Sequence, residues 1–236
     1  MEYTFDLHLH SCLTPYADET MTPQLIATEC ALEGYDIVAL TDYNSCGNSA
    51  AFQAAAEANG ILAIPGMELC LREDAHVICL FPTLEQAQAF SALVRTKLPN
   101  VENNPEVFGH QTLVDENDQI LGEETAFLVG ACDIGVYEIV DLVELFGGVV
   151  YPAHLELNAF SVLSNLGLWD PAMKFHLAEV TPDCPPEFFD SVPFLSGVRH
   201  ITGCNARRVE EIPPVSQTME LPERTARAVI DWLKAH

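Results

Sequence analysis

The sequence predicts an α/β protein built around a mostly parallel sheet, and three observations support this fold class. Segments with the two-residue period of strands alternate along the chain with segments that have the 3.6-residue period of helices. Some expected strands are almost entirely apolar, as in YDIVALTD (35–42), which is typical of strands covered on both faces. The length of 236 residues also suits one α/β barrel. We therefore expect a single domain over residues 1–236.

The pattern of the sequence predicts the individual strands and helices as follows, beginning at the N-terminus. The first strand, at residues 3–10, leads into a helix at 22–34 that Thr22 can cap and Gly34 can end. The remaining strands are expected at residues 35–42, 61–69, 76–81, 148–154, 175–181 and 198–205. The remaining helices are expected at residues 48–60, 84–97, 136–146 and 222–234.

Residues 98–128 interrupt this alternation. They contain HQTLVDENDQILGEE (110–124), in which two short apolar runs flank a polar turn, a pattern that predicts a β-hairpin. We interpret this hairpin and helical segment as a small insertion over one edge of the sheet rather than as a second domain.

The composition limits the classes of partner. The chain has 35 acidic and 10 basic residues and a formal net charge of −25, so we expect neither nucleic acid nor a membrane surface as a partner. No apolar run is long enough to span a bilayer and no leader pattern is visible, which favours a cytoplasmic protein. The eight cysteines include no C-x-x-C pair and are expected to be reduced. A small substrate is compatible with this charge, because a local cationic site can outweigh a distant acidic surface.

The first strand ends in FDLHLHSC (5–12), which contains two closely spaced histidines. Alternation along a strand places Asp6, His8 and His10 on one face. Buried imidazoles need a partner, and a metal ion is a common one. Taken alone, the pattern fits a metal site and a solvated edge strand equally well.

Other strand ends carry similar groups. Asp42, Glu68 and His154 each follow an apolar run, and His76 adjoins another. The ends of barrel strands converge on one face, so these residues can meet although they are distant in sequence. An acid such as Glu68 can bridge two cations while histidines complete the coordination. The set therefore predicts a metal centre more strongly than any of its members.

At these residues the chain resembles the PHP family, named for polymerase and histidinol phosphatase. The motifs occur in the order of the family and read DLHLHSCLTPYAD, GYDIVALTDYNS, IPGMEL, AHVICLF, VYPAHLE and ITGCNAR. The resemblance implies a distorted (β/α)7 TIM-like barrel with two or three metal ions, usually acting on phosphoesters. It implies that His8 and His10 bind a first metal, that Glu68 bridges, and that His76 and His154 complete a second.

Three positions depart from the family pattern. Tyr43 stands where the T-D-H-N motif has histidine, and Asn205 and Arg207 replace the aspartate and histidine of S-D-A-H. A further ligand of the family lies in the loop after His10, where Asp18 is a candidate. Arg207 has no lone pair to give a metal, but its guanidinium can hold a phosphate oxygen. We therefore expect one or two ions of Zn, Fe or Mn rather than three, with Asn205 as a weaker ligand.

Two functions follow from these residues. In the first, the protein hydrolyses a small phosphomonoester, such as a nucleotide or a histidinol-phosphate-like compound, with hydroxide that the metal makes available. Arg207 then offsets charge on the phosphate, with Arg208 beside it, while Asp42 orients the site and His110 reaches over it from the insertion. In the second, the protein is a degenerate family member that binds metal or ligand without efficient catalysis. The sequence leaves the substrate, the metal and the oligomeric state open.

Overall fold

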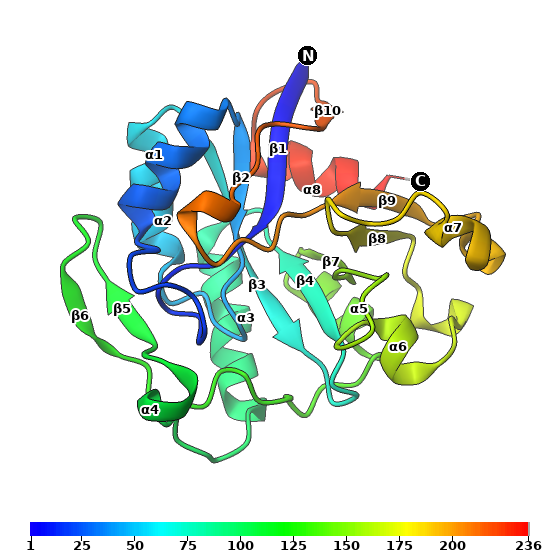
Figure 1. Cartoon of the computed structure of the whole chain (residues 1–236), viewed down its shortest axis with the longest axis horizontal. Coiled ribbons are helices and arrows are strands. Elements are labelled where there is room, and N and C mark those ends of the chain that lie inside the picture. Colours follow the sequence, from blue (N-terminus) through cyan, green and yellow to red (C-terminus); the bar gives the residue numbers. More distant parts are fainter. Residues whose placement is uncertain (236) are drawn as a thin grey trace.

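A six-stranded sheet forms the centre of the computed structural model, which describes residues 1–235 (Figure 1). Its strand order is β10-β1-β2-β3-β4-β7. The bounds are Thr218–Glu220 for β10, Glu2–Leu9 for β1, Ile37–Leu40 for β2, Leu62–Cys70 for β3, His76–Leu80 for β4 and Val149–Pro152 for β7. A separate parallel pair consists of β8 (Leu177–Val180) and β9 (Arg199–Thr202). The strands expected from the sequence are present, β10 is an addition, and residue 236 of the expected domain lies outside the described residues.

The direction of β4 differs from the parallel arrangement that the sequence predicts. Strands β1, β2 and β3 are parallel, whereas β4 runs antiparallel to both β3 and β7. Only residues 71–75 separate β3 from β4, and a parallel crossover needs about a dozen or more. The reversal has a consequence for function, because the first residue of β4, His76, lies at the edge where β1 and β3 end.

The sheet curls into a half-barrel, and β8 and β9 lie between its two ends. On one side, the backbone N–H of His10 donates to the carbonyl of Ala206 beyond β9, at 3.1 Å. On the other, the N–H of Leu155 beyond β7 donates to the backbone carbonyl of Glu179 in β8, at 2.8 Å. The segments that follow β1, β7 and β9 are therefore held together at one edge of the fold.

Eight α-helices and three short 3-10 helices are assigned among the described residues. The bounds of the α-helices are Pro23–Glu33 (α1), Ser49–Ala58 (α2), Leu84–Lys97 (α3), Pro105–Phe108 (α4), Ile139–Leu145 (α5), Val162–Leu166 (α6), Phe188–Ser191 (α7) and Ala226–Lys234 (α8). The expected ends of α1 are confirmed, since Thr22 Oγ1 accepts a hydrogen bond from Leu25 and Gly34 has a left-handed φ of 88°. The sequence did not predict α6 and α7, because a helix of four or five residues is too short to show a period.

Apolar side chains pack in three clusters. One joins strands β1, β2 and β7 to α8, a second places β1 and β2 against α1 and α2, and a third joins β3 and β4 to α3 and α5. No helix in residues 1–235 is both long enough and apolar enough to cross a bilayer.

A bulge in β1 changes the faces that its side chains occupy. The register with β2 shifts between Asp6 and Leu9, and Leu7 packs in the cluster with α8 whereas Leu9 packs in the cluster with α1. The Asp6 carboxylate accepts the backbone N–H of His8 at 2.9 Å and that of Cys204 at 3.1 Å, which closes the bulge. Asp6 thus binds backbone groups, and the regular alternation that would place it with the histidine rings is broken.

Residues 98–128 contain the expected hairpin, formed by β5 (Thr112–Val114) and β6 (Ile120–Glu123). It packs against the loop between β1 and α1, because Thr112 N–H donates to the carbonyl of Cys12 at 3.0 Å. Val114 N–H donates to Asn48 Oδ1 at 3.1 Å and so joins the hairpin to the start of α2.

Candidate metal centre

Four histidines and one glutamate meet at the edge of the sheet described above. His8 and His10 come from the end of β1, Glu68 from β3, His76 from the start of β4, and His154 follows β7. Each is at most 3% exposed. The structure thus brings together five of the residues that the strand ends singled out, although 146 positions separate His8 from His154.

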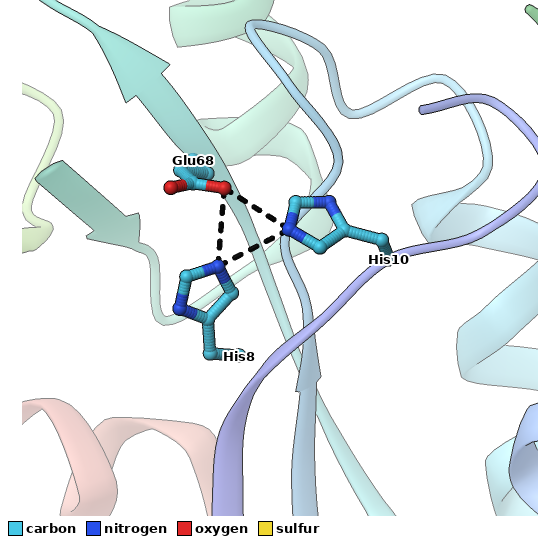
Figure 2. A group of neighbouring side chains, drawn as sticks. All are labelled: His8, His10 and Glu68. Atoms are coloured by element: carbon cyan, nitrogen blue, oxygen red, sulfur yellow. Dashed lines mark hydrogen bonds and ion pairs between the residues drawn. The ribbon is translucent and has the colours of Figure 1, made fainter. Parts of the chain in front are cut away.

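His8, His10 and Glu68 form a first cluster (Figure 2). The Nε2 atoms of His8 and His10 lie 3.2 Å apart. Glu68 Oε2 lies 3.1 Å from the first and 3.0 Å from the second. Three potential ligand atoms therefore face one another at the corners of a small triangle.

Hydrogen bonds on the opposite side of each ring define the tautomers of these histidines. His8 Nδ1 lies 2.7 Å from Glu179 Oε1, and because the carboxylate can only accept, His8 Nδ1 carries the proton. His10 Nδ1 lies 2.9 Å from Thr14 Oγ1, whose own proton is donated to Asp42 at 2.8 Å, so His10 Nδ1 also donates. When both imidazoles are neutral, each Nε2 therefore presents its lone pair to the centre of the cluster.

Glu68, His76 and His154 form a second cluster. Glu68 Oε1 lies 2.8 Å from His76 Nδ1 and 3.0 Å from His154 Nε2. His76 Nδ1 is within ion-pair distance of the carboxylate but lacks the geometry of a hydrogen bond, and it is buried without another hydrogen-bond partner in residues 1–235. Glu68 thus presents one carboxylate oxygen to each cluster.

The titration of these groups favours a cation between them. Although burial opposes the charged form, the carboxylates of Glu179 and Glu68 raise the pKa of His8 to about 10. Burial lowers the pKa of His10 to about 3, so that its ring is neutral. Burial also opposes ionisation of Glu68, but His8 and the other histidines outweigh it and hold the pKa of Glu68 well below its usual range. The two carboxylates therefore favour one positive charge in this cluster, carried either by the His8 proton or by a bound cation, while the His10 ring beside it is neutral.

The donor set fits a divalent metal ion. Ligands bound at about 2.0–2.2 Å to one ion lie roughly 3–3.5 Å from each other, and the distances within the first cluster fall in that interval. Imidazole nitrogen with carboxylate oxygen suits Zn, Fe or Mn. When His8 and His10 are both neutral, their Nε2 lone pairs and the Glu68 carboxylate face one another without a donor, and a metal ion would supply the positive charge that they need.

Comparison with known families identifies the chain. A model of the PHP domain matches residues 6–137, which is more than half of the sequence. The chain belongs to the PHP domain family. The matched segment includes His8, His10, Glu68 and His76, and the resemblance inferred from the motifs is confirmed. A search of curated proteins found no match.

Several solved structures share the fold of this PHP chain. An endonuclease Q complex with a 27-mer duplex carrying an abasic lesion at the active site has a TM-score of 0.74 at 18% identity, covering 99% of this chain and 57% of that one. The lesion-specific endonuclease Q of Pyrococcus furiosus has a TM-score of 0.72 at 16% identity, covering 98% and 55%. A protein of Bifidobacterium adolescentis, provisionally described as a metal-dependent phosphoesterase, has a TM-score of 0.62 at 16% identity, covering 91% of both chains. The chain thus spans little more than half of the endonucleases, and at these identities the likeness shows the fold alone.

Asn205 lies against the first cluster. It follows β9 in the left-handed region, with a φ of 53°, and its backbone N–H donates to the carbonyl of His8 at 2.9 Å. Its Oδ1 lies 3.0 Å from His10 Nε2. A neutral amide oxygen therefore lies beside the predicted ligands His8 and His10.

Tyr43 and Arg207, two of the positions expected to depart from the family pattern, bind each other. Arg207 Nη2 donates to Tyr43 Oη at 2.5 Å, and the guanidinium carbon lies 5.4 Å from the centre of the Tyr43 ring. That ring lies between the two clusters, with centroid distances of 5.0 Å to His10 and 5.2 Å to His76. A cation–phenol pair therefore borders both predicted metal positions.

Asp42 lies behind the first cluster rather than in it. Its carboxylate accepts hydrogen bonds from Ser11 N–H at 2.6 Å, Ser11 Oγ at 2.7 Å and Thr14 Oγ1 at 2.8 Å. Burial raises the pKa of Asp42 to about 6. Because Thr14 also accepts from His10, Asp42 orients a predicted ligand through one intermediate hydroxyl.

The other predicted site residues lie outside both clusters. Asp18 is exposed and its Oδ1 accepts from the N–H and hydroxyl of Thr20, at 2.9 and 2.8 Å. Arg208 is exposed next to Arg207. His110 is exposed, and its Nδ1 lies 2.7 Å from Glu123 Oε1 across the hairpin.

Glu179 is a residue that the sequence did not single out. It is fully buried on β8, and its contact with His8 is possible because Gly203 has no side chain: a Cβ there would lie 2.2 Å from Glu179 Oε2. The only sequence signal was a single acid in the apolar strand FHLAEVT. A buried acid in such a strand usually has a charged or metal-linked partner.

Proposed function

We propose that the protein is a metal-dependent phosphoesterase that hydrolyses a small phosphomonoester. The observation that carries the proposal is the position of Glu68, whose two carboxylate oxygens face two separate groups of buried histidine nitrogens. A bridging acid of this kind is the arrangement that holds two ions close together. In this proposal the curled sheet and β8–β9 together make the seven-stranded barrel of the family.

The proposed roles follow the contacts. His8, His10, Glu68 and Asn205 would hold one ion, and Glu68, His76 and His154 a second, so that one or two ions are bound. A divalent ion at such a site supplies Lewis acidity, which polarises a phosphoryl oxygen and makes water more acidic. The chain contributes Arg207, whose guanidinium has further N–H groups besides the one given to Tyr43 and can hold phosphate oxygens.

Asp18 and His110 lie outside both clusters, so their proposed roles are peripheral. The Asp18 carboxylate accepts hydrogen bonds from Thr20, so Asp18 would become a metal ligand only after the loop that follows His10 rearranges around an ion. His110 and Arg208 would contact substrate at the periphery, since both are exposed.

Cleavage of nucleic acid is a second candidate, favoured by the likeness to endonuclease Q. The charge of the chain opposes it: with 10 basic and 35 acidic residues, few side chains can neutralise a phosphate backbone. A small substrate needs only the local charge that Arg207 and the ions provide.

The test begins with protein purified without chelator. Zn, Fe and Mn are quantified by mass spectrometry, and hydrolysis of a panel of phosphomonoesters and of an abasic DNA duplex is assayed with and without added Mn²⁺. We expect one or two ions per chain and turnover of phosphomonoesters, both lost in Glu68→Gln. Bound metal without turnover of any substrate would favour the degenerate, ligand-binding alternative. If no metal is bound and added Mn²⁺ restores no turnover, the proposal that the protein is an enzyme is refuted.

A further inference from the structure

Phe160, in the loop after β7, has an unusual backbone conformation for a bulky residue. Its φ is 57°, in the left-handed region that such residues rarely adopt. The conformation is fixed from both sides: the Phe160 carbonyl accepts the N–H of His76 at 2.8 Å, and Ser161 caps α6 by accepting from Ser164 at 3.1 Å. Strain that the surrounding structure maintains in this way is frequent at functional sites.

The ring of Phe160 covers a predicted metal ligand on one side and is open on the other. Its plane lies 16° from that of the His76 imidazole, with the centroids 4.9 Å apart. The residue is nevertheless 47% exposed. An aromatic residue that only filled the core would be buried, so a large part of this ring is free to contact something else.

The exposed ring belongs to a continuous row of groups. From the Arg207 guanidinium the row passes to the Tyr43 ring at 5.4 Å, to the His76 ring at 5.2 Å and to the Phe160 ring at 4.9 Å. One end of the row is a cation suited to phosphate, and the other end is an exposed aromatic face. A compound with an anionic end and a planar end matches this order of groups.

We infer that Phe160 is a specificity-determining residue that stacks on a planar heteroaromatic ring in the leaving group of the substrate. The inference rests on the proposed phosphoesterase activity and narrows it: nucleoside monophosphates are preferred to phosphomonoesters without a ring. Because its backbone is fixed, the phenyl ring is oriented before the substrate binds, which lowers the entropy lost on binding.

The test compares two substrates that differ only in the ring. A nucleoside 5′-monophosphate and ribose 5-phosphate share the phosphate and the sugar, and only the first carries a base. We expect the wild type to prefer the nucleotide in kcat/KM, and Phe160→Ala to reduce that preference about five- to hundredfold, the range for loss of one base–aromatic stack. Phe160→Trp should retain it. Phe194→Ala is the matched control, because Phe194 is 58% exposed elsewhere on the chain.

Metal content and calorimetric binding of both compounds are measured on the same variants. If Phe160→Ala weakens both compounds equally or loses metal, the ring serves only to position His76 and the inference is wrong. If ribose 5-phosphate and the nucleotide are hydrolysed with equal kcat/KM, the phosphoesterase activity is supported and the stacking role of Phe160 is refuted. If neither is hydrolysed, the proposed function fails, and the inference is decided by binding: it survives only if the nucleotide binds more tightly and the difference depends on Phe160.

Discussion

At the scale of single residues, Glu179 has the most direct effect on the predicted metal site, because it fixes the tautomer of His8. We expect Glu179→Gln to weaken metal binding about 10- to 100-fold, since the amide cannot supply the charge that the carboxylate gives to His8. Chelator competition measures the affinity. Glu144→Gln removes the same charge from an exposed position and is the control. Equal affinities for the two variants would show that Glu179 has no influence on the ligand.

Asn205 allows the opposite change. Its Oδ1 lies 3.0 Å from His10 Nε2, so Asn205→Asp places a second carboxylate beside the first cluster. We expect metal affinity to rise about tenfold or more, because an anionic oxygen attracts a divalent ion more strongly than a neutral one. Asn158→Asp adds the same charge at an exposed position. Affinity that rises equally in both variants would mean that only the overall charge matters.

Arg207 is the residue predicted to contact phosphate. Arg207→Ala should raise the inhibition constant of inorganic phosphate about tenfold and leave the metal content unchanged, because a charge-assisted hydrogen bond is lost but no ligand is removed. Arg227→Ala, which loses an exposed arginine paired with Asp231, provides the comparison. Unchanged phosphate inhibition would exclude Arg207 from the site.

At the scale of elements, the β1 bulge decides where the two histidines point. Asp6 accepts two backbone N–H groups there while only 4% exposed. Asp6→Ala leaves both donors buried without a partner, at a cost of about 2–4 kcal/mol in the free energy of unfolding, and should also lower metal content. Asp6→Asn retains an acceptor oxygen and should recover most of both quantities. Urea denaturation and metal analysis measure them, and normal metal content in Asp6→Ala would show that the bulge does not control the site.

Strand β1 also shows which features of the fold can be predicted from the sequence and which cannot. The strands and main helices, the caps of α1 and the convergence of His8, Glu68 and His154 were predictable, because each depends on local periodicity or on where strands end. The bulge, which separates Asp6 from the histidines, and the reversal of β4 were not, because they depend on contacts between distant segments. The roles of Glu179 and Phe160 could not be predicted for the same reason, because their partners, His8 and His76, are distant in the chain.

At the scale of the whole molecule, the predicted site joins segments from β1 to β9, so metal binding should stabilise the entire fold. A ligand that binds only the native state at about 100 times its Kd adds about 2.7 kcal/mol. For a chain of this length that corresponds to about 5–10 °C in Tm. We therefore expect removal of metal by EDTA to lower Tm by this amount, and added Mn²⁺ or Zn²⁺ to restore it.

The difference in Tm between the metal-loaded and metal-free protein also tests whether the two clusters act as one centre. Glu68 contributes an oxygen to each cluster, so Glu68→Gln should abolish the metal-dependent shift, whereas His154→Ala, which alters only the second cluster, should leave part of it. Differential scanning calorimetry with and without EDTA gives both values. A full shift in Glu68→Gln would mean that the stabilising ion binds elsewhere, and loss of the whole shift in His154→Ala would mean that the first cluster holds no ion without the second.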